Sequence, residues 1–457
     1  MPRRLVAAIA VVAALVRVPT ALRPGQLGFD DGAYGWSAVA MRHGALPFVD
    51  VFSGQGPLFL PLLRVADVVG LQAMWAPRLL GLFALAALVA VVGCLADVGG
   101  GRRAAIVAMA VVATSGLVFR TTTAIEADPV AAAFAAGAVL VGVRRGPWWL
   151  LGLVAGAALS VKSLLVVPAV VAAGAVYLGA RGVGDAARAA GVAVAVAVAL
   201  AAPWGIGDVW HQSVAFHLQA RGGVHVRSNV ELIADAAWES ERLLVVVAVV
   251  ALLAVVARRV RGRPVAGAHA GTGEGDRRVV AAAVIWLAGT AVILAVHSPL
   301  FSHHAMALVP PAAILVGLAR PPIAALVLGG LLVLPGQVSR VDWRLRADRF
   351  PGQEQAISDL RRLVPEGRTV ITDGPGLAWW AATVPDPWLV DISLVRIDAG
   401  YLTKGEIEEA AVAPDACAVL VWSPRLANLG RLRLPGYVFA ARYGAGQVLW
   451  VRKDCDS

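Results

Sequence analysis

Two adjacent carboxylates, Asp30 and Asp31, directly follow the first hydrophobic segment of this 457-residue chain. They open residues 25–60 (GQLGFDDGAYGWSAVAMRHGALPFVDVFSGQGPLFL), which turn amphipathic and end in another apolar run. A carboxylate within hydrogen-bond distance of a hydroxyl can act as a general base and take its proton. The alternative is a solvated loop in which Asp31 caps a helix over residues 33–42. The pair therefore predicts proton transfer at a membrane face or, in the simpler interpretation, a helix start.

Further polar side chains lie beside later hydrophobic segments. Charged groups within or against membrane segments cost free energy, so they are functional candidates by default. The candidates are Arg120, Glu126, Asp128, Lys162, His211, His217, His303 and His304. A plain interfacial position is the alternative for Arg120, His211 and His217. For Asp128 the alternative is an N-cap of a helix that begins near Pro129.

Membrane-spanning helices must position these side chains, because the composition is that of a polytopic membrane protein. The chain is 59% hydrophobic and 15% charged, whereas soluble domains carry about 25% charged residues. Arginines lie in short clusters between the apolar runs, as they do in cytoplasmic loops. The net charge of +10 therefore reflects membrane topology, and we expect a lipid bilayer and no nucleic acid among the partners.

The apolar segments predict about 11 transmembrane helices within residues 1–338. The first is an uncleaved span over residues 1–22, for which a signal peptide is the alternative. The others lie at about 76–96, 104–119, 129–143, 148–161, 164–180, 191–206, 243–257, 279–297, 304–318 and 321–338. With a cytoplasmic N-terminus, every arginine cluster lies inside and the candidate residues lie outside. Residues 57–71 are expected to form an amphipathic helix on the outer interface, and residues 258–278 a flexible connector.

The composition changes near residue 339, and residues 339–457 are predicted to form a small extracytoplasmic α/β domain. Its expected helices are 353–364 and 404–412, and its expected strands are 368–372, 417–422, 437–443 and 447–452, the last two as a hairpin. Cys417 and Cys455 could pair in an exported domain, although the sequence does not show it. Trp379 and Trp380 are either a sugar-stacking platform or part of a buried core.

The order of the motifs resembles that of a known enzyme family. A hydrophobic helix is followed by F-D-D-G-A-Y, then by G-x-L-P-F-V-D-V-F, and then by G-P-L-F-L. Later come E-A-D-P at residues 126–129 and a glycine-rich segment that ends in S-V-K-S around Lys162. This arrangement resembles the polytopic GT-C glycosyltransferases, in the branch of the protein O-mannosyltransferases and aminoarabinose transferases. The chain departs from that branch at Gln55, where aminoarabinose-type members have an acid.

The resemblance implies a GT-C-like transmembrane catalytic domain over residues 1–338 in the plasma membrane. It also implies inverting transfer of a sugar from a polyprenyl-phosphate donor to a hydroxyl of a glycan, lipid or protein acceptor on the extracytoplasmic face. Asp30 matches the family's catalytic aspartate and Asp31 its acidic neighbour. The remaining candidates, Arg120, Glu126, Asp128, Lys162, His303 and His304, would bind substrate, with the cations stabilising the leaving phosphate.

Neither a metal site nor another function class is settled by the sequence. The pair His303-His304 cannot form a zinc site alone, so we assign no metal ligands and leave a divalent cation open. A lipid-carrier flippase or transporter is the alternative function, although it would need charged residues near the middle of the membrane. A non-catalytic scaffold is a third alternative, but it leaves Asp30 and Asp31 without a role.

Overall fold

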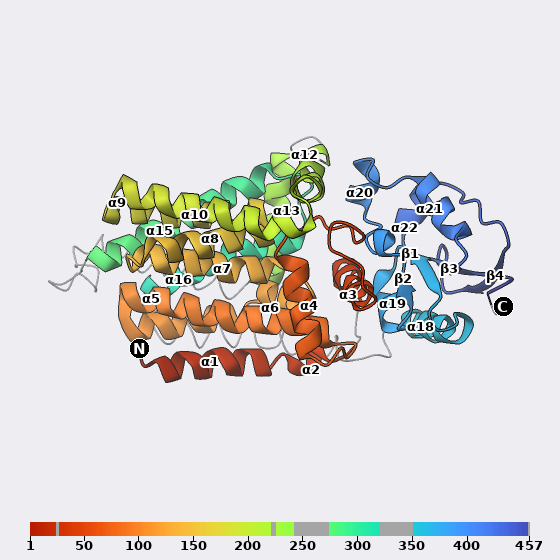
Figure 1. Ribbon diagram of the computed structural model, residues 1–457. Coiled ribbons are helices and arrows are strands. Elements are labelled where there is room, and N and C mark those ends of the chain that lie inside the picture. Colours follow the sequence, from red (N-terminus) through yellow and green to blue (C-terminus); the bar gives the residue numbers. More distant parts are fainter. Residues whose placement is uncertain (24–26, 221–224, 242–273, 320–350, 456–457) are drawn as a thin grey trace.

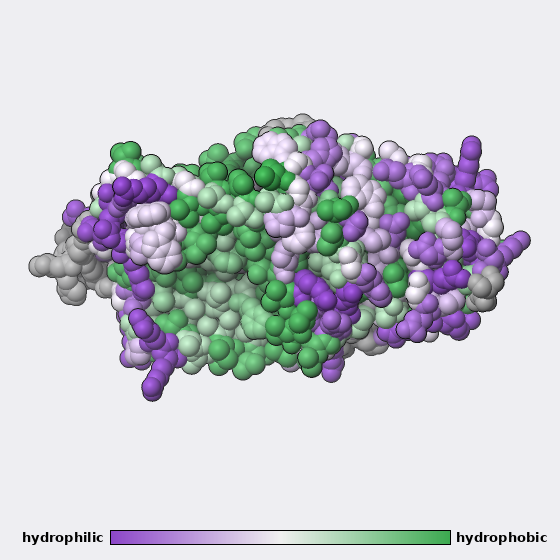
Figure 2. Space-filling model, in the orientation of Figure 1, coloured by the Kyte–Doolittle hydropathy of each residue, from purple (hydrophilic) through white to green (hydrophobic). Residues whose placement is uncertain are grey.

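The computed structural model describes residues 1–23, 27–220, 225–241, 274–319 and 351–455. Figure 1 shows an elongated molecule in which a bundle of long helices carries a smaller domain at one end. Figure 2 shows that the visible face of the bundle is largely apolar, whereas the domain and the opposite end of the bundle are polar. This distribution is that of a multi-pass membrane protein with a water-exposed domain.

The bundle consists of helices that match the predicted apolar segments. They are α1 (Arg3–Leu15), α2 (Val18–Ala21), α5 (Leu79–Thr114), α7 (Ala127–Val143), α8 (Trp148–Val161), α9 (Ser163–Arg181), α10 (Val183–Ala201), α15 (Glu274–Val296) and α16 (Val309–Ala319). Within the described residues, six helices are long and apolar enough to cross a membrane, or seven if a bent pair counts as one span. The predicted spans at 243–257 and 321–338 and the connector up to residue 273 lie outside the described residues. The total of about 11 spans and the domain boundary near residue 339 therefore stay predictions.

Helix α5 is a helical hairpin rather than one long span. Gly101 interrupts it with φ 72° and ψ −170°, a conformation that favours glycine. Residues 16 apart on a straight helix would be about 24 Å apart, yet the Met109 side chain lies within 2.5 Å of the place that a Cβ on Gly93 would occupy. The chain therefore reverses at Gly101, and its two halves correspond to the separate spans predicted at 76–96 and 104–119.

Short helices gather at the end of the bundle that faces the domain. They are α3 (Phe29–Arg42), α4 (Phe59–Val69), α6 (Gly116–Thr123), α11 (Ile206–Trp210), α12 (Phe216–Gln219), α13 (Val226–Ser240) and the 3-10 helix η4 (Ser302–Leu308). Two N-cap alternatives are wrong, because α3 begins before Asp31 and α7 begins before Asp128. Both carboxylates lie in the first turn of their helix, where the helix dipole favours negative charge. Helices α6 and α7 meet at an angle of 116°.

The C-terminal domain has the predicted α/β character. Its strands β1 (Thr369–Thr372), β2 (Val384–Pro385), β3 (Ala416–Val421), β4 (Tyr437–Arg442) and β5 (Val448–Arg452) form one sheet in the order β2-β1-β3-β5-β4. Its helices are α18 (Pro351–Leu363), α19 (Pro375–Trp380), α20 (Leu394–Asp398), α21 (Lys404–Val412) and α22 (Pro424–Asn428). The predicted hairpin β4–β5 is confirmed, whereas β2, α19, α20 and α22 are too short to leave a periodic pattern. Cys417 and Cys455 form a disulfide.

Helix α3 joins the bundle to the domain by close packing on α19. A Cβ on Gly32 would lie 2.1 Å from the backbone nitrogen of Gly376, and one on Gly35 would overlap the Trp379 ring. The Trp36 indole also donates a hydrogen bond of 3.0 Å to the carbonyl of Thr383. Because Trp379 is fully buried in this contact, the sugar-platform interpretation of the tryptophan pair is wrong. The domain is therefore fastened to the helix that carries Asp30 and Asp31.

Candidate active site

One cavity of about 820 Å³ lies between the bundle and the C-terminal domain. All the residues predicted as catalytic or substrate-binding line it, namely Asp30, Asp31, Arg120, Glu126, Asp128, Lys162, His303 and His304. His217 also lines the cavity. His211 instead packs against Tyr401, with 4.7 Å between the ring centroids. The structure thus brings together residues that are up to 274 positions apart in the chain (304 − 30).

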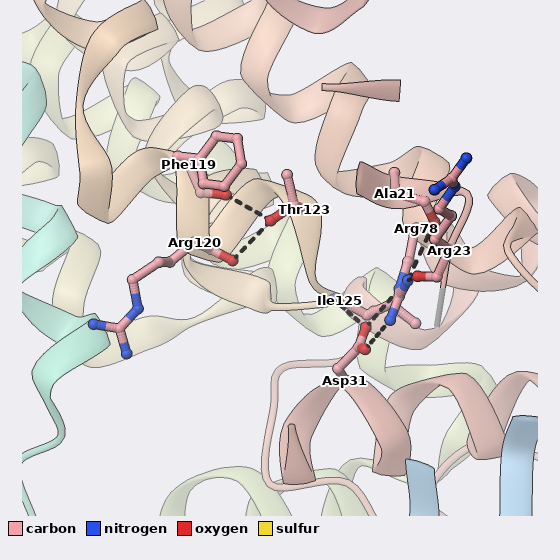
Figure 3. Close-up of polar contacts among 8 residues, drawn as sticks. All are labelled: Ala21, Arg23, Asp31, Arg78, Phe119, Arg120, Thr123 and Ile125. Carbon is pink, nitrogen blue, oxygen red and sulfur yellow. Dashed lines mark hydrogen bonds and ion pairs between the residues drawn. The ribbon is translucent and has the colours of Figure 1, made fainter. Parts of the chain in front are cut away.

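The two adjacent aspartates have different surroundings, although both follow the same helix start. Both oxygens of Asp31 are occupied, because Arg78 binds them through Nε (3.1 Å) and Nη2 and the backbone N–H of Ile125 donates to Oδ1 at 2.9 Å (Figure 3). Asp30 makes no hydrogen bond or ion pair within the described residues. Asp31 is therefore part of the scaffold, whereas the Asp30 carboxylate is available to a ligand.

Arg78 holds the Asp31 side of the site together. It ends the short 3-10 helix η1 (Ala76–Arg78) and also donates to the carbonyls of Ala21 (3.2 Å) and Arg23 (2.6 Å). Its guanidinium lies 5.4 Å from the ring centroids of both Trp379 and Trp380. One buried cation thus contacts α2, α3 and α19, and the acidic partner compensates its charge. Figure 3 shows Arg120 pointing away from this group.

The bundle side of the cavity, which we call the bundle wall, comprises Arg120, Glu126, Asp128, Lys162, His303 and His304. Lys162 stands at the joint between α8 and α9 and forms an ion pair of 2.7 Å with Asp128. The other Asp128 oxygen, Oδ1, and Glu126 Oε2 are buried without a hydrogen-bond partner in the part of the chain that the structure describes. Two unsatisfied buried carboxylate oxygens are unfavourable, so this wall is arranged for a further donor or a cation.

A divalent cation fits these groups. One ligand atom from each of Glu126, Asp128 and His303 lies within 4.8 Å of the other two. A mixed set of carboxylate oxygens and imidazole nitrogen suits Zn²⁺ or Mn²⁺. The sequence analysis predicts that each of these residues binds substrate, but it does not predict that they lie together. Their proximity depends on the bend between α6 and α7 and on the approach of η4, which are tertiary features.

A different part of the same cavity is apolar. Helix α10 contributes Val194 and Val198, which are 64% and 47% exposed, and Trp210 of α11 is 59% exposed. These side chains line the cavity and also reach the outer surface of the bundle. The polar end of the cavity therefore continues into an apolar surface on the membrane side.

The C-terminal domain completes the cavity with residues that the sequence did not single out. We call Asp391, Ser393 and Arg425 the domain wall. They lie more than 360 positions after Asp30 (391 − 30 = 361). Asp391 and Ser393 directly precede α20, and Arg425 lies in the short helix α22. None of them belongs to a motif, so no sequence signal points to them. Gln55, at the departure from the family pattern, also lines the cavity and donates a hydrogen bond of 2.7 Å to the Tyr34 hydroxyl.

Comparison with known proteins identifies the fold. No protein-family model and no curated protein matches the sequence. Among solved structures, ArnT from Cupriavidus metallidurans bound to undecaprenyl phosphate aligns over 97% of each chain, with a TM-score of 0.64 and 14% identity. The chain has the GT-C fold. Two structures of the oligosaccharyltransferase of Archaeoglobus fulgidus are also similar. The one tethered to an acceptor peptide with an NVT sequon has a TM-score of 0.51 and 13% identity, and the alignment covers 98% of this chain and 74% of that chain. The one in complex with Zn and sulfate has a TM-score of 0.51 and 14% identity, and the alignment covers 96% of this chain and 72% of that chain.

Proposed function

We propose that this GT-C protein transfers a sugar from a polyprenyl-phosphate donor to an acceptor hydroxyl, with inversion at the anomeric carbon. The observation that carries this proposal is the Asp30 carboxylate, which has no partner among the described residues and lies in a cavity that Lys162 and Arg120 also line and that has an apolar exit. A general base and a site for an anionic leaving group are the two parts that such a transfer needs.

Asp30 is the base in this mechanism. Its carboxylate accepts the proton of the acceptor hydroxyl while the hydroxyl oxygen forms a bond to the anomeric carbon. The bond from that carbon to the phosphate oxygen breaks on the opposite side, and its electron pair leaves with the polyprenyl phosphate. Asp31 positions Asp30, because Arg78 and the Ile125 N–H fix the turn of α3 on which both lie.

The bundle wall would receive the leaving phosphate. Lys162 and Arg120 both line it, and cations held in a poorly hydrated site stabilise developing negative charge more strongly than they do in water. A divalent cation on Glu126, Asp128 and His303 would add charge stabilisation at the same place. The donor's isoprenoid chain would lie along Val194 and Val198 of α10, where it remains in the membrane. The undecaprenyl phosphate bound to the similar ArnT supports this choice of donor class.

We also propose that the cavity faces the extracytoplasmic side. The Cys417–Cys455 disulfide belongs to an oxidising compartment. The arginine pairs at 102–103 and 144–145 follow the reversal of α5 and the end of α7, and Figure 1 shows these turns at the end of the bundle opposite the domain. Positive loops at that end favour a cytoplasmic position for it.

The experiment uses the purified protein in lipid with a panel of polyprenyl-phosphate sugars and a crude envelope fraction as acceptor. Release of free polyprenyl phosphate is measured for the wild type, Asp30→Asn and Asp31→Asn. We expect turnover to fall by about a hundredfold or more in Asp30→Asn, while its thermal unfolding stays near that of the wild type. Retained turnover in Asp30→Asn would exclude it as the base. Donor movement across the bilayer without turnover would support the flippase alternative.

A further inference from the structure

The domain wall carries two charged groups that are close to Asp30 and are not paired with each other. Asp391 and Arg425 both line the cavity, and Arg425 interacts electrostatically with both Asp30 and Asp391. Neither forms an ion pair with a residue in the described ranges. Both carry enough free hydrogen-bonding capacity to contact a ligand.

Arg425 is held in place by its surroundings. Its guanidinium lies 4.0 Å from the centroid of the Phe29 ring, next to Asp30 in the chain. Its Nη1 donates to the Ser423 hydroxyl oxygen at 3.0 Å, and that hydroxyl donates to Asp373 at 2.8 Å. Stacking and a relay of hydrogen bonds thus fix the guanidinium plane. The Nε and Nη2 groups have no hydrogen-bond partner among the described residues.

Asp391 is held equally firmly. Its Oδ1 accepts a hydrogen bond of 2.9 Å from the N–H of Ser393. Arg396, which is fully buried, donates from Nη1 to the carbonyl of Asp391 at 2.9 Å and to that of Trp388 at 2.6 Å. Its guanidinium lies 4.1 Å from the centroid of the Phe52 ring of the first loop. Burial raises the pKa of Asp391 and lowers the pKa of Arg425, because the charged form of each group is poorly hydrated. A ligand that forms hydrogen bonds with these groups would stabilise their charged forms.

We infer that Asp391, Ser393 and Arg425 form the acceptor subsite of this cavity and that the acceptor is a neutral carbohydrate. The inference rests on the proposed function, since it assigns the donor to the bundle wall. It follows from position, because Asp391, Ser393 and Arg425 belong to the polar C-terminal domain at the end of the bundle, whereas Val194 and Val198 belong to α10 within the bundle (Figure 1). An acceptor hydroxyl that reaches Asp30 from the side of the domain would meet Asp391 and Arg425, because both line the same cavity as Asp30.

The charge of the subsite indicates the class of acceptor. One carboxylate and one guanidinium cancel, so a strongly anionic acceptor would meet Asp30 and Asp391, and a cationic one would meet Arg425. The neighbouring hydroxyls of a neutral sugar can donate to Asp391 and accept from Arg425 and Ser393. The domain thus selects a polyol next to the hydroxyl that Asp30 deprotonates.

Binding and turnover test this inference separately. The probes for binding to the full-length protein in lipid are neutral mannose, galactose and arabinose oligosaccharides, a hydroxyl-bearing peptide and a phosphorylated oligosaccharide. The variants are Asp391→Asn and Arg425→Gln, with Asp398→Asn and Arg433→Gln as controls, because those two side chains are exposed on the same domain. Undecaprenyl phosphate binding is the readout for the donor side, and thermal unfolding reports folding.

We expect at least one neutral oligosaccharide to bind, and Asp391→Asn and Arg425→Gln to weaken it by about 10- to 100-fold, the effect of losing a charged hydrogen bond. The controls and the affinity for undecaprenyl phosphate should stay unchanged. No binding of any neutral oligosaccharide, or tighter binding of the peptide or the phosphorylated sugar, would overturn the inference. Acceptor-dependent turnover with an unchanged acceptor KM in both variants would overturn it while leaving the proposed function intact. Asp391-dependent sugar binding without turnover of any donor would instead count against the proposed function alone.

Discussion

The two walls of the cavity hold their charges in different ways. On the bundle wall, Glu126 and Asp128 keep oxygens without a hydrogen-bond partner in the described part of the chain, and the charges there come from helices that pack directly on one another. On the domain wall, Asp391 and Arg425 are positioned by buried groups behind them, Arg396 and Asp373. The bundle wall thus resembles a site for a charged group, whereas the domain wall resembles a site for hydroxyls. Asp30 interacts electrostatically with both walls, through Glu126 and Asp391, and the proposed role as a base that joins two substrates requires such a position.

Removing Arg78 should have the largest effect, because this residue connects α2 and α3 with α19 of the C-terminal domain. Arg78→Ala leaves Asp31 buried without its cation and removes the contacts to Trp379 and Trp380. Breaking a buried ion pair from one side costs about 3–5 kcal/mol, which should be visible in the free energy of unfolding in detergent. The control is Arg64→Ala, since Asp67 keeps its ion pair with Arg42. Equal unfolding of the two variants would show that Arg78 does not stabilise the connection between α3 and the C-terminal domain.

The second prediction contrasts Lys162 with Arg425. Lys162→Met should lower kcat by about 100-fold, because it removes a cation from the leaving phosphate, and it should weaken donor binding without changing the acceptor KM. Arg425→Gln should do the reverse and change chiefly the acceptor KM. Initial rates measured over both substrate concentrations distinguish the two patterns. If both variants changed the same KM, the assignment of donor and acceptor to separate walls would be wrong.

A smaller effect is expected from divalent cations. Protein treated with a chelator should recover donor affinity on addition of Mn²⁺ or Zn²⁺, by about 10-fold, because the cation would satisfy Glu126 and Asp128. Glu126→Gln should remove this dependence, while oligosaccharide binding to the domain wall stays the same in all samples. Isothermal titration with the metal alone gives an independent readout. Identical metal binding by wild type and Glu126→Gln would contradict the cation site.

The smallest effect is a pH dependence of the domain wall. Burial raises the pKa of Asp391, although the nearby Arg396 opposes this shift and Asp30 adds to it. As the pH falls through the raised pKa, the Asp391 carboxylate is protonated and accepts hydrogen bonds from sugar hydroxyls less strongly. Oligosaccharide affinity should therefore decrease several-fold at acidic pH in the wild type and much less in Asp391→Asn. Matching pH profiles for the two proteins would remove Asp391 from the acceptor subsite.

Much of this arrangement follows from local sequence patterns. The helices α18 and α21 and the hairpin β4–β5 lie where apolar periodicity and turn residues predict them. The residues of the bundle wall were also predictable, because a charged side chain beside a membrane helix stands out against an apolar background. The division of roles between Asp30 and Asp31 was not, since it depends on Arg78, 47 residues further along the chain.

The sequence by itself determined that this is a multi-pass membrane protein with a small α/β domain and a polar site at one end of its helices. These features depend on composition, periodicity and charge order, which a chain carries without any long-range contact. Only the tertiary structure decided which aspartate has no partner among the described residues, that Glu126, Asp128 and His303 converge, and that the domain closes the cavity with Asp391 and Arg425. The first outcome depends on Arg78 and the Ile125 N–H, the second on the bend between α6 and α7 and the approach of η4, and the third on the contact of α3 with α19. Contacts between segments that are distant in the chain leave no periodic pattern in either segment.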